Sequence, residues 1–342
     1  MIPAPIFSGT FFIVLGISFL AAVSVVLWIV ALVLFPPVRR SFRAYRRRST
    51  AIFAALCVTS SFVVAMVAIG LQAEANIRKE EAAKHPALVK SERLLGIDMP
   101  PGTRLSLSTA GDMNSIEKAE FPHAVDVYGI AAVALTVGTE FDDEAPRNDR
   151  DLATLTALTL TITGPRTIDG WTCGSKAPLK IVLRNDARTR TLWSCHLADG
   201  NRVAGGVVPA GSRVMRSTTT YGDGMRDNDY WEIRVAEGDV FELSSIPLRH
   251  PELRLDRERN VLAFDYATLA RAASVGNIAY PAGTEVAFGV RGLREDYPGA
   301  WRFRTRGRQH AVDKNTGPIA DGASVVQAPS GKVYAIFPGR TD

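Results

Sequence analysis

The sequence predicts a membrane-anchored, all-β protein. It comprises an N-terminal two-helix transmembrane hairpin and a large extracytoplasmic β-domain of the sandwich or barrel type. Three observations predict this fold class: two long uncharged stretches within the first 71 residues, six arginines between them, and a dozen short strand-like runs that follow from about Ile97. The boundaries that these observations give are a tail at 1–10, helices at 11–35 and 51–72, an Arg-rich loop at 36–50, a stalk or linker helix at 73–96, and a β-domain at 97–342.

Each uncharged stretch is long enough to cross a bilayer. Phe11–Phe35 runs 25 residues and Ala51–Leu71 runs 21 residues without an ionisable side chain, and a spanning helix needs about 20 apolar residues. The alternative for the first stretch is a cleaved signal peptide. Its leader carries no positive charge and its apolar run is too long for that class, so we expect a retained anchor.

The basic character of the chain comes from one short segment. No acid precedes Glu74, and the basic residues before that point are Arg39, Arg40, Arg43, Arg46, Arg47 and Arg48. Removing these six from the 40 Lys and Arg leaves 34 against 35 Asp and Glu, a net charge of −1. A broad phosphate-binding face is therefore not indicated, and we expect no nucleic-acid partner.

The same arginines predict the orientation of the hairpin. Lys and Arg in short loops stay on the cytoplasmic side, where they also contact anionic lipid headgroups. The N-terminal tail has none. This asymmetry places the Arg-rich loop inside and residues 73–342 outside, which we interpret as the periplasm of a bacterium with the hairpin in the inner membrane.

The segment after the second span has the composition of a polar helix. In AEANIRKEEAAKH, Glu80 and Lys84 have the favourable i,i+4 spacing. We expect the helix to continue as a stalk that stops near Pro86, with a disordered linker as the alternative.

Short β-type runs separated by turn residues predict the second domain. In WRFRT, Trp301 and Phe303 share one face, whereas Arg302 and Arg304 share the other. We expect the tryptophans of these runs to fill the core. YATLARAA (266–273) is the one run there with a helical pattern.

A short turn recurs before three of these runs. PPGTRLSL (100–107), PAGSRVM (209–215) and PAGTEVAF (281–288) each have Pro-x-Gly-Thr/Ser entering a strand. The recurrence is open to two interpretations, a duplicated β-unit or common turn chemistry.

Two cysteines of the β-domain lie in matched contexts, WTC at Cys173 and WSC at Cys195. An oxidising compartment favours a disulfide. One geometric objection is that a strand at LKIVLRN, if it lay between them, would hold them about 9–10 Å apart. Two buried thiols are the alternative. A metal site has a weaker basis, because His196 is the one nearby partner.

The patterns that could carry chemistry are few. Asp223, Asp227 and Asp229 are weak candidates for a calcium site on a glycine-rich loop, for which a solvated turn is the simpler interpretation. Ser115 and Lys118 fit S-x-x-K, but no accompanying catalytic element follows. We expect no cofactor, no metal and no catalytic residues.

These observations favour an accessory subunit of a membrane complex, whose periplasmic β-domain binds another envelope protein. Its further contacts are membrane lipid and, through the transmembrane helices, other copies of the chain. Two alternatives stay open: an envelope enzyme or ligand-binding sensor with a dispersed site, and a membrane-perturbing effector gated by the β-domain.

Overall fold

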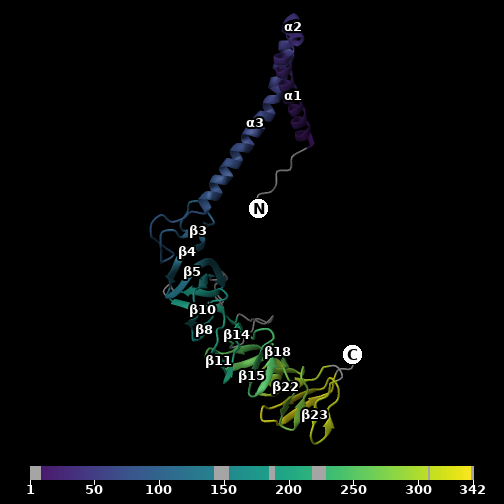
Figure 1. Cartoon of the computed structure of the whole chain (residues 1–342). Helices are drawn as coiled ribbons and strands as arrows, with labels where there is room; N and C mark the ends of the chain where they lie inside the picture. The colour runs from purple at the N-terminus through teal and green to yellow at the C-terminus, as the bar shows by residue number, and fades with distance from the viewer. Residues whose placement is uncertain (1–8, 142–153, 185–188, 218–228, 307–308, 340–342) are drawn as a thin grey trace, which may run out of the picture. The chain divides into compact units, whose positions relative to one another are not determined.

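The computed structural model describes residues 9–141, 154–184, 189–217, 229–306 and 309–339 (Figure 1). The chain divides into two compact units, Met1–Lys84 and His85–Asp342. The first unit is helical, and the second consists mainly of β-strands. The all-β class expected for the second unit is confirmed.

The helical unit consists of α1 (Gly9–Leu34), α2 (Pro36–Ala44) and α3 (Arg46–Lys84). The segment 36–50, expected as a loop, is therefore helical on both sides of a break at Tyr45. Proline fits the first turn of a helix, where its missing N–H is not needed, and arginine has a high helix propensity. The helix α3 ends two residues before Pro86.

The helices α1 and α3 pack on each other over small and aromatic side chains. Ser18 and Ala21 are buried. The Trp28 ring meets Phe53 edge-on at 5.9 Å, and Phe42 of α2 at 6.4 Å. Both α1 and α3 are long and apolar enough to cross a membrane, and only 11% and 0% of their most apolar windows are buried. They therefore do not form the buried core of a larger domain.

The second unit is built on one large antiparallel sheet whose strands follow each other in chain order. Its strands along this path are β3 (Arg104–Leu107), β4 (Ile116–Val127), β5 (Ile130–Phe141), β6 (Thr154–Ile162), β9 (Leu179–Arg184), β10 (Thr189–His196), β13 (Arg213–Arg216), β14 (Trp231–Arg234), β17 (Glu252–Leu255), β18 (Val261–Leu269), β21 (Glu285–Phe288), β22 (Trp301–Arg304), β25 (Ser324–Gln327) and β26 (Val333–Phe337). In Figure 1 the labelled strands of this sheet, from β3 through β10 and β18 to β22, follow one another in the same order. Each strand therefore contacts mainly its sequence neighbours, as in repeat proteins.

Short strand pairs interrupt this path at intervals. They are β1 (Glu92–Leu94) with β2 (Ile97–Met99), β7 (Arg166–Ile168) with β8 (Trp171–Cys173), β11 (Arg202–Val203) with β12 (Gly206–Val207), β15 (Val240–Leu243) with β16 (Ile246–Arg249), and β19 (Ala273–Val275) with β20 (Ile278–Tyr280); β23 (Val312–Asp313) and β24 (Gly317–Pro318) join the last of these pairs. The first four pairs and the β4–β5 connection turn through two residues that both have positive φ. Two-residue turns of this kind are common in β-hairpins, because their backbone twist matches the twist of the two strands that they connect. In this unit they begin at residues 95, 128, 169, 204 and 244.

The core lies between the large sheet and the short hairpins. One cluster joins main-sheet residues such as Leu158 and Phe264 to hairpin residues such as Trp171 and Phe241, all of them fully buried. The sheet does not close into a barrel, because its two ends, β3 and β26, do not pair with each other. In place of the second sheet of a sandwich, a series of short hairpins shares the core, and one of them, β15–β16, also pairs with β18 of the large sheet.

The recurrent Pro-x-Gly-Thr/Ser turn has the same geometry at all three places. In each, a leucine N–H donates to the carbonyl of the Thr or Ser, and the leucine carbonyl accepts from the Gly N–H. The leucine, glycine and hydroxyl residues are Leu88, Gly102 and Thr103; Leu197, Gly211 and Ser212; and Leu269, Gly283 and Thr284, with N···O distances of 2.7–2.9 Å. All three hydroxyl residues are fully buried. A repeated structural unit therefore underlies the motif.

The helix expected at 266–273 is wrong. Its first half belongs to β18, and the short helix of this unit is α4 (Arg291–Asp296). The register between β18 and β21 shifts between Phe264 and Ala267. This bulge interrupts the strand alternation and produces the apparent helical pattern.

Candidate functional site

The last strand of the sheet, β26, has an open edge. In the part of the chain that the structure describes, it pairs with β25 on one side and with no strand on the other. Four of its five side chains are large, apolar and exposed: Val333 (39%), Tyr334 (43%), Ile336 (49%) and Phe337 (45%). Among the described residues of this unit, only four other large hydrophobic side chains are exposed to this degree. The exposed apolar surface is thus concentrated on one strand.

The outer face of this edge is supported by α4. Leu293 of α4 packs with Ala300 and Val326 in a small second core, against which Tyr297 and Ala335 are partly buried. The Tyr297 ring lies 6.1 Å from Tyr334 and 6.4 Å from Phe337. These contacts hold the aromatic side chains of β26 in a fixed arrangement.

The inner face of β26 continues the main core. Ile336 pairs in register with Val325, which is 1% exposed and belongs to the core cluster. Ile336 itself is half-exposed because no described residue covers it on the far side. The core therefore ends on an incompletely buried strand.

The opposite edge of the sheet is covered. Ala87 forms a bridge with Arg104 of β3, and the Leu105 N–H donates to the Pro86 carbonyl at 2.9 Å. Arg104 and Glu120 also form an ion pair at 3.0 Å on this edge. Coverage and charge are the usual protections of an edge strand. Such protection is found at β3, whereas β26 itself carries no charge.

Cys173 and Cys195 form a disulfide, with 5.8 Å between their Cα atoms. LKIVLRN is a strand, β9, but it does not lie between them, so the geometric objection does not apply. Cys173 is at the end of the β7–β8 hairpin and forms a bridge with Leu197, directly beyond β10. Sequence order alone could not show that the hairpin lies beside β10.

The four tryptophans of the β-domain differ in environment. Trp171, Trp231 and Trp301 are at most 3% exposed, and Trp171 meets Trp231 edge-on at 6.0 Å. Trp193 is only partly buried, because the register of β9 and β10 shifts between Leu192 and Ser194. This bulge means that Trp193 and Cys195 do not share the environment that strand alternation predicts.

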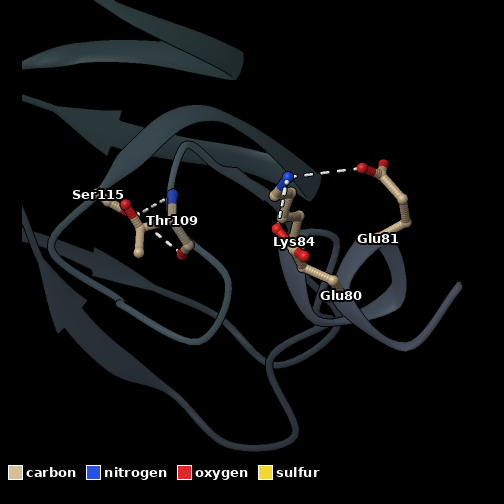
Figure 2. Close-up of polar contacts among 5 residues, drawn as sticks. All are labelled: Glu80, Glu81, Lys84, Thr109 and Ser115. Carbon is tan, nitrogen blue, oxygen red and sulfur yellow. Dashed lines mark hydrogen bonds and ion pairs between the residues drawn. The ribbon is translucent and has the colours of Figure 1, made fainter. Parts of the chain in front are cut away.

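Ser115 and Lys118 have different partners. The Ser115 hydroxyl accepts from the Thr109 N–H at 3.1 Å and donates to the Asp112 carbonyl at 2.7 Å, so it closes a turn. Figure 2 shows its contacts with Thr109. Lys118 forms an ion pair with Glu120 at 2.6 Å.

The predicted helical pair on α3 is present. The Lys84 ammonium lies 3.2 Å from Glu80 and 3.5 Å from Glu81 (Figure 2). The hydrogen bond that the Lys84 ammonium donates to Glu80, followed by the charges of both carboxylates, raises the pKa of Lys84. These contacts favour a helix rather than a disordered linker up to Lys84.

The weak calcium candidates are not brought together in the described structure. Asp223 and Asp227 lie outside the described residues. Asp229 is buried, and the Ser217 hydroxyl donates to its carboxylate. Among the described residues, no group of three or more His, Cys, Asp or Glu side chains could hold a metal ion.

The six arginines of the first unit lie on α2 and at the start of α3, and all are exposed. One has a structural contact: the Arg39 guanidinium donates to the Leu32 carbonyl at 2.6 Å and also to Val33. It therefore caps the C-terminus of α1, where carbonyls lack helical partners.

No protein-family model, curated protein or solved structure matches the chain. The fold and the surfaces described above define a protein with a pair of long apolar helices and an antiparallel β-repeat unit that ends in an open apolar edge.

Proposed function

We propose that this chain is an inner-membrane-anchored envelope protein whose periplasmic β-domain is an accessory subunit of a membrane complex. The anchor is the α1–α3 hairpin. Its apolar side chains are largely exposed, and such a surface is stable in hydrocarbon but costly in water. The β-domain itself has a binding role.

Two observations support a periplasmic β-domain. The arginines near the turn of the hairpin would remain on the cytoplasmic side, at about 1 kcal/mol of headgroup attraction each. The Cys173–Cys195 disulfide lies in the second unit, and disulfides persist in oxidising compartments such as the periplasm. Both observations favour the same orientation.

The open edge of β26 carries the proposed binding role. An unpaired strand presents N–H and C=O groups that another extended segment can pair with, and apolar side chains on alternate faces provide pockets for it. We propose that an extended apolar segment of a second envelope protein adds to β26 as an antiparallel strand. That strand would also cover Ile336 and complete the core.

A second copy of the chain fits this edge less well. Two β26 strands related by a two-fold axis would double the sheet and place the two β3 ends 27 inter-strand steps apart, about 130 Å along the sheet at ~4.8 Å per step. Both membrane anchors would then have to reach the same bilayer from opposite ends. A partner strand imposes no such constraint.

The test is purification of the full-length chain from membranes in mild detergent, as wild type and as Ile336→Lys. A lysine on the edge strand opposes strand addition. We expect wild type to retain one envelope protein in fixed stoichiometry and Ile336→Lys to lose it. Photo-crosslinking from position 334 should reach a single extended segment of that protein.

The matched control is Val207→Lys, which adds the same charge at an exposed apolar residue of β12 (52% exposed). It should retain the partner. The proposal is wrong if Ile336→Lys retains the partner, if both variants lose it, or if position 334 crosslinks to a second copy of the chain.

A further inference from the structure

A second surface, separate from the β26 edge, has the character of a ligand site. It is a hollow of about 580 Å³ on the outer face of β17, β18, β21 and β22. Sites of about 300–1,000 Å³ accommodate small molecules. The hollow is therefore large enough for a compact ligand of one or two rings.

One small side chain, that of Ala287, forms the floor of the hollow. Ala287 of β21 points away from the core, between Val286 and Phe288, which belong to the core or pack against it. Its cross-strand neighbour on β22 is Arg302. On the other side lie the bulged residues of β18. Because the Ala287 methyl group is shorter than the side chains around it, the space above it forms the hollow.

The lining is strongly basic. Its arginines are Arg254, Arg291, Arg302, Arg304 and Arg306. Three of these arginines have carboxylate partners. Asp265 and Glu285, both in the lining, pair with Arg254 at 2.5 Å and with Arg306, and Glu295, outside the lining, lies 3.5 Å from Arg291. The net charge of the lining is +3, so the hollow attracts anions.

Arg302 and Arg304 are the residues best placed to bind. Both are exposed, and neither forms an ion pair with any residue that the structure describes. The register neighbours of Arg302 are Ala287 and Val326, which carry no charge. Two guanidinium groups on one strand can hold a phosphate by paired, charge-assisted hydrogen bonds.

Tyr266 adds an aromatic surface to the hollow. It occupies the β18 bulge with φ +57° and is 81% exposed. A left-handed conformation is unfavourable for a tyrosine, and bulges commonly redirect side chains next to binding sites. Packing does not account for this ring, whereas stacking on a ligand ring would.

We infer that the hollow binds a small organic phosphate ester, with its phosphate on Arg302 and Arg304 and its ring on Tyr266. The phosphate could belong to a soluble ester or to a lipid headgroup. The inference does not depend on β26, because no residue of that strand lines the hollow.

Titration calorimetry on the full chain in detergent tests the site with two probes, inorganic pyrophosphate and glucose 1-phosphate. We expect one site for each, weakened at least tenfold in the double variant Arg302→Gln/Arg304→Gln. Arg213→Gln, at an exposed arginine of β13, is the matched control and should bind as wild type does. Thermal melting checks that the variants fold.

Tyr266→Gly separates binding from structure. It should raise the melting temperature by removing the strained conformation, leave pyrophosphate binding unchanged, and weaken glucose 1-phosphate binding at least threefold. If the ring had only a structural role, the affinity for both probes would remain as in wild type.

Nanodiscs distinguish the two phosphate sources. If phosphatidylglycerol nanodiscs displace pyrophosphate and phosphatidylcholine nanodiscs do not, the ligand is an anionic headgroup. If neither does while glucose 1-phosphate still binds, it is a soluble ester. The inference is overturned if neither probe binds to wild type, or if Arg213→Gln weakens binding as much as the double variant.

Discussion

Cys173 and Cys195 lie with their Cα atoms 5.8 Å apart and join the β7–β8 hairpin to strand β10 of the main sheet. The bond links a short hairpin to the second main-sheet strand that follows it in the chain. Because both cysteines are at most 2% exposed, it also lies within the core.

Removing this bond should destabilise the second unit. The loop it closes contains about 20 residues, so Cys173→Ala/Cys195→Ala should lower the free energy of unfolding by about 3 kcal/mol. Urea unfolding followed by the fluorescence of the buried tryptophans measures it. Cys57→Ala, in α3, should leave this transition unchanged. Labelling of all three cysteines in the urea-unfolded chain without reductant would contradict the bond.

The repeated turns should respond alike to the same substitution. The hydroxyls of Thr103 and Thr284 donate to Pro100 and Pro281 at 2.7 and 2.8 Å. Thr103→Ala and Thr284→Ala should each cost about 1 kcal/mol. Costs that differ by more than about 1 kcal/mol would show that the two turns are not equivalent in energy.

A close backbone contact makes Gly289 hard to replace. It has φ +65°, and a Cβ there would overlap the carbonyl oxygen of Leu262 on β18. Gly289→Ala should destabilise the unit by about 3 kcal/mol, because the backbone must shift. Gly292→Ala in α4, where a Cβ meets no atom within 4 Å, is the control and should be neutral or stabilising. Equal effects in the two variants would contradict the contact.

The sequence was sufficient for the coarse architecture. The two uncharged apolar stretches form helices, and the alternating residues around Trp301 form a strand. Both are local patterns that can be recognised in the sequence. The repeat was only partly visible. Its hairpin turns vary at the first position, where Leu95, Tyr128, Asp169, Ala204 and Ser244 stand, and four of the five have glycine at the second position. A single glycine is a weak signal, so the longer Pro-x-Gly-Thr/Ser pattern was the one that could be recognised in the sequence.

The candidate sites could not be predicted from sequence, for physical reasons. The open edge of β26 depends on which strand has no neighbour, and VYAIF resembles any buried strand. The hollow depends on the bulge at Tyr266, and the sequence at this bulge, YATLARAA, suggested a helix instead. Arg302 and Arg304 were assigned correctly to one face, but the residues opposite them depend on the register with β21 and β25. Arg302 lies opposite the uncharged Ala287 and Val326. Arg304 lies opposite Glu285, whose carboxylate pairs with Arg306 instead.

Tyr280 should make the second unit sensitive to alkali. Its hydroxyl donates to the buried Gln327 Oε1 at 3.1 Å, and its ring stacks on Phe303 at 4.4 Å. Burial, and then the charge of Asp313, raise the pKa of Tyr280. Because the folded pKa exceeds the unfolded value of about 10, this contribution to stability is complete below about pH 10 and is lost as the pH rises further.

Tyr280→Phe separates the hydrogen bond to Gln327 from the titration of the Tyr280 hydroxyl. At pH 7 it should lower stability by about 1 kcal/mol, since Gln327 loses its donor. Above about pH 10 it should lose less stability than wild type. Thr284→Ala, of similar cost but without a titrating group, should keep the wild-type loss. Parallel pH profiles for wild type and Tyr280→Phe would contradict the assignment.

The orientation of the two units across the membrane is the central claim, and cysteine labelling in intact spheroplasts tests it most directly. In a Cys57→Ala background, Tyr266→Cys in the β-domain and Tyr45→Cys between α2 and α3 each add one exposed thiol. A membrane-impermeant maleimide should label Tyr266→Cys at once and Tyr45→Cys only after permeabilisation. The reverse pattern would place the β-domain in the cytoplasm and contradict the proposed function.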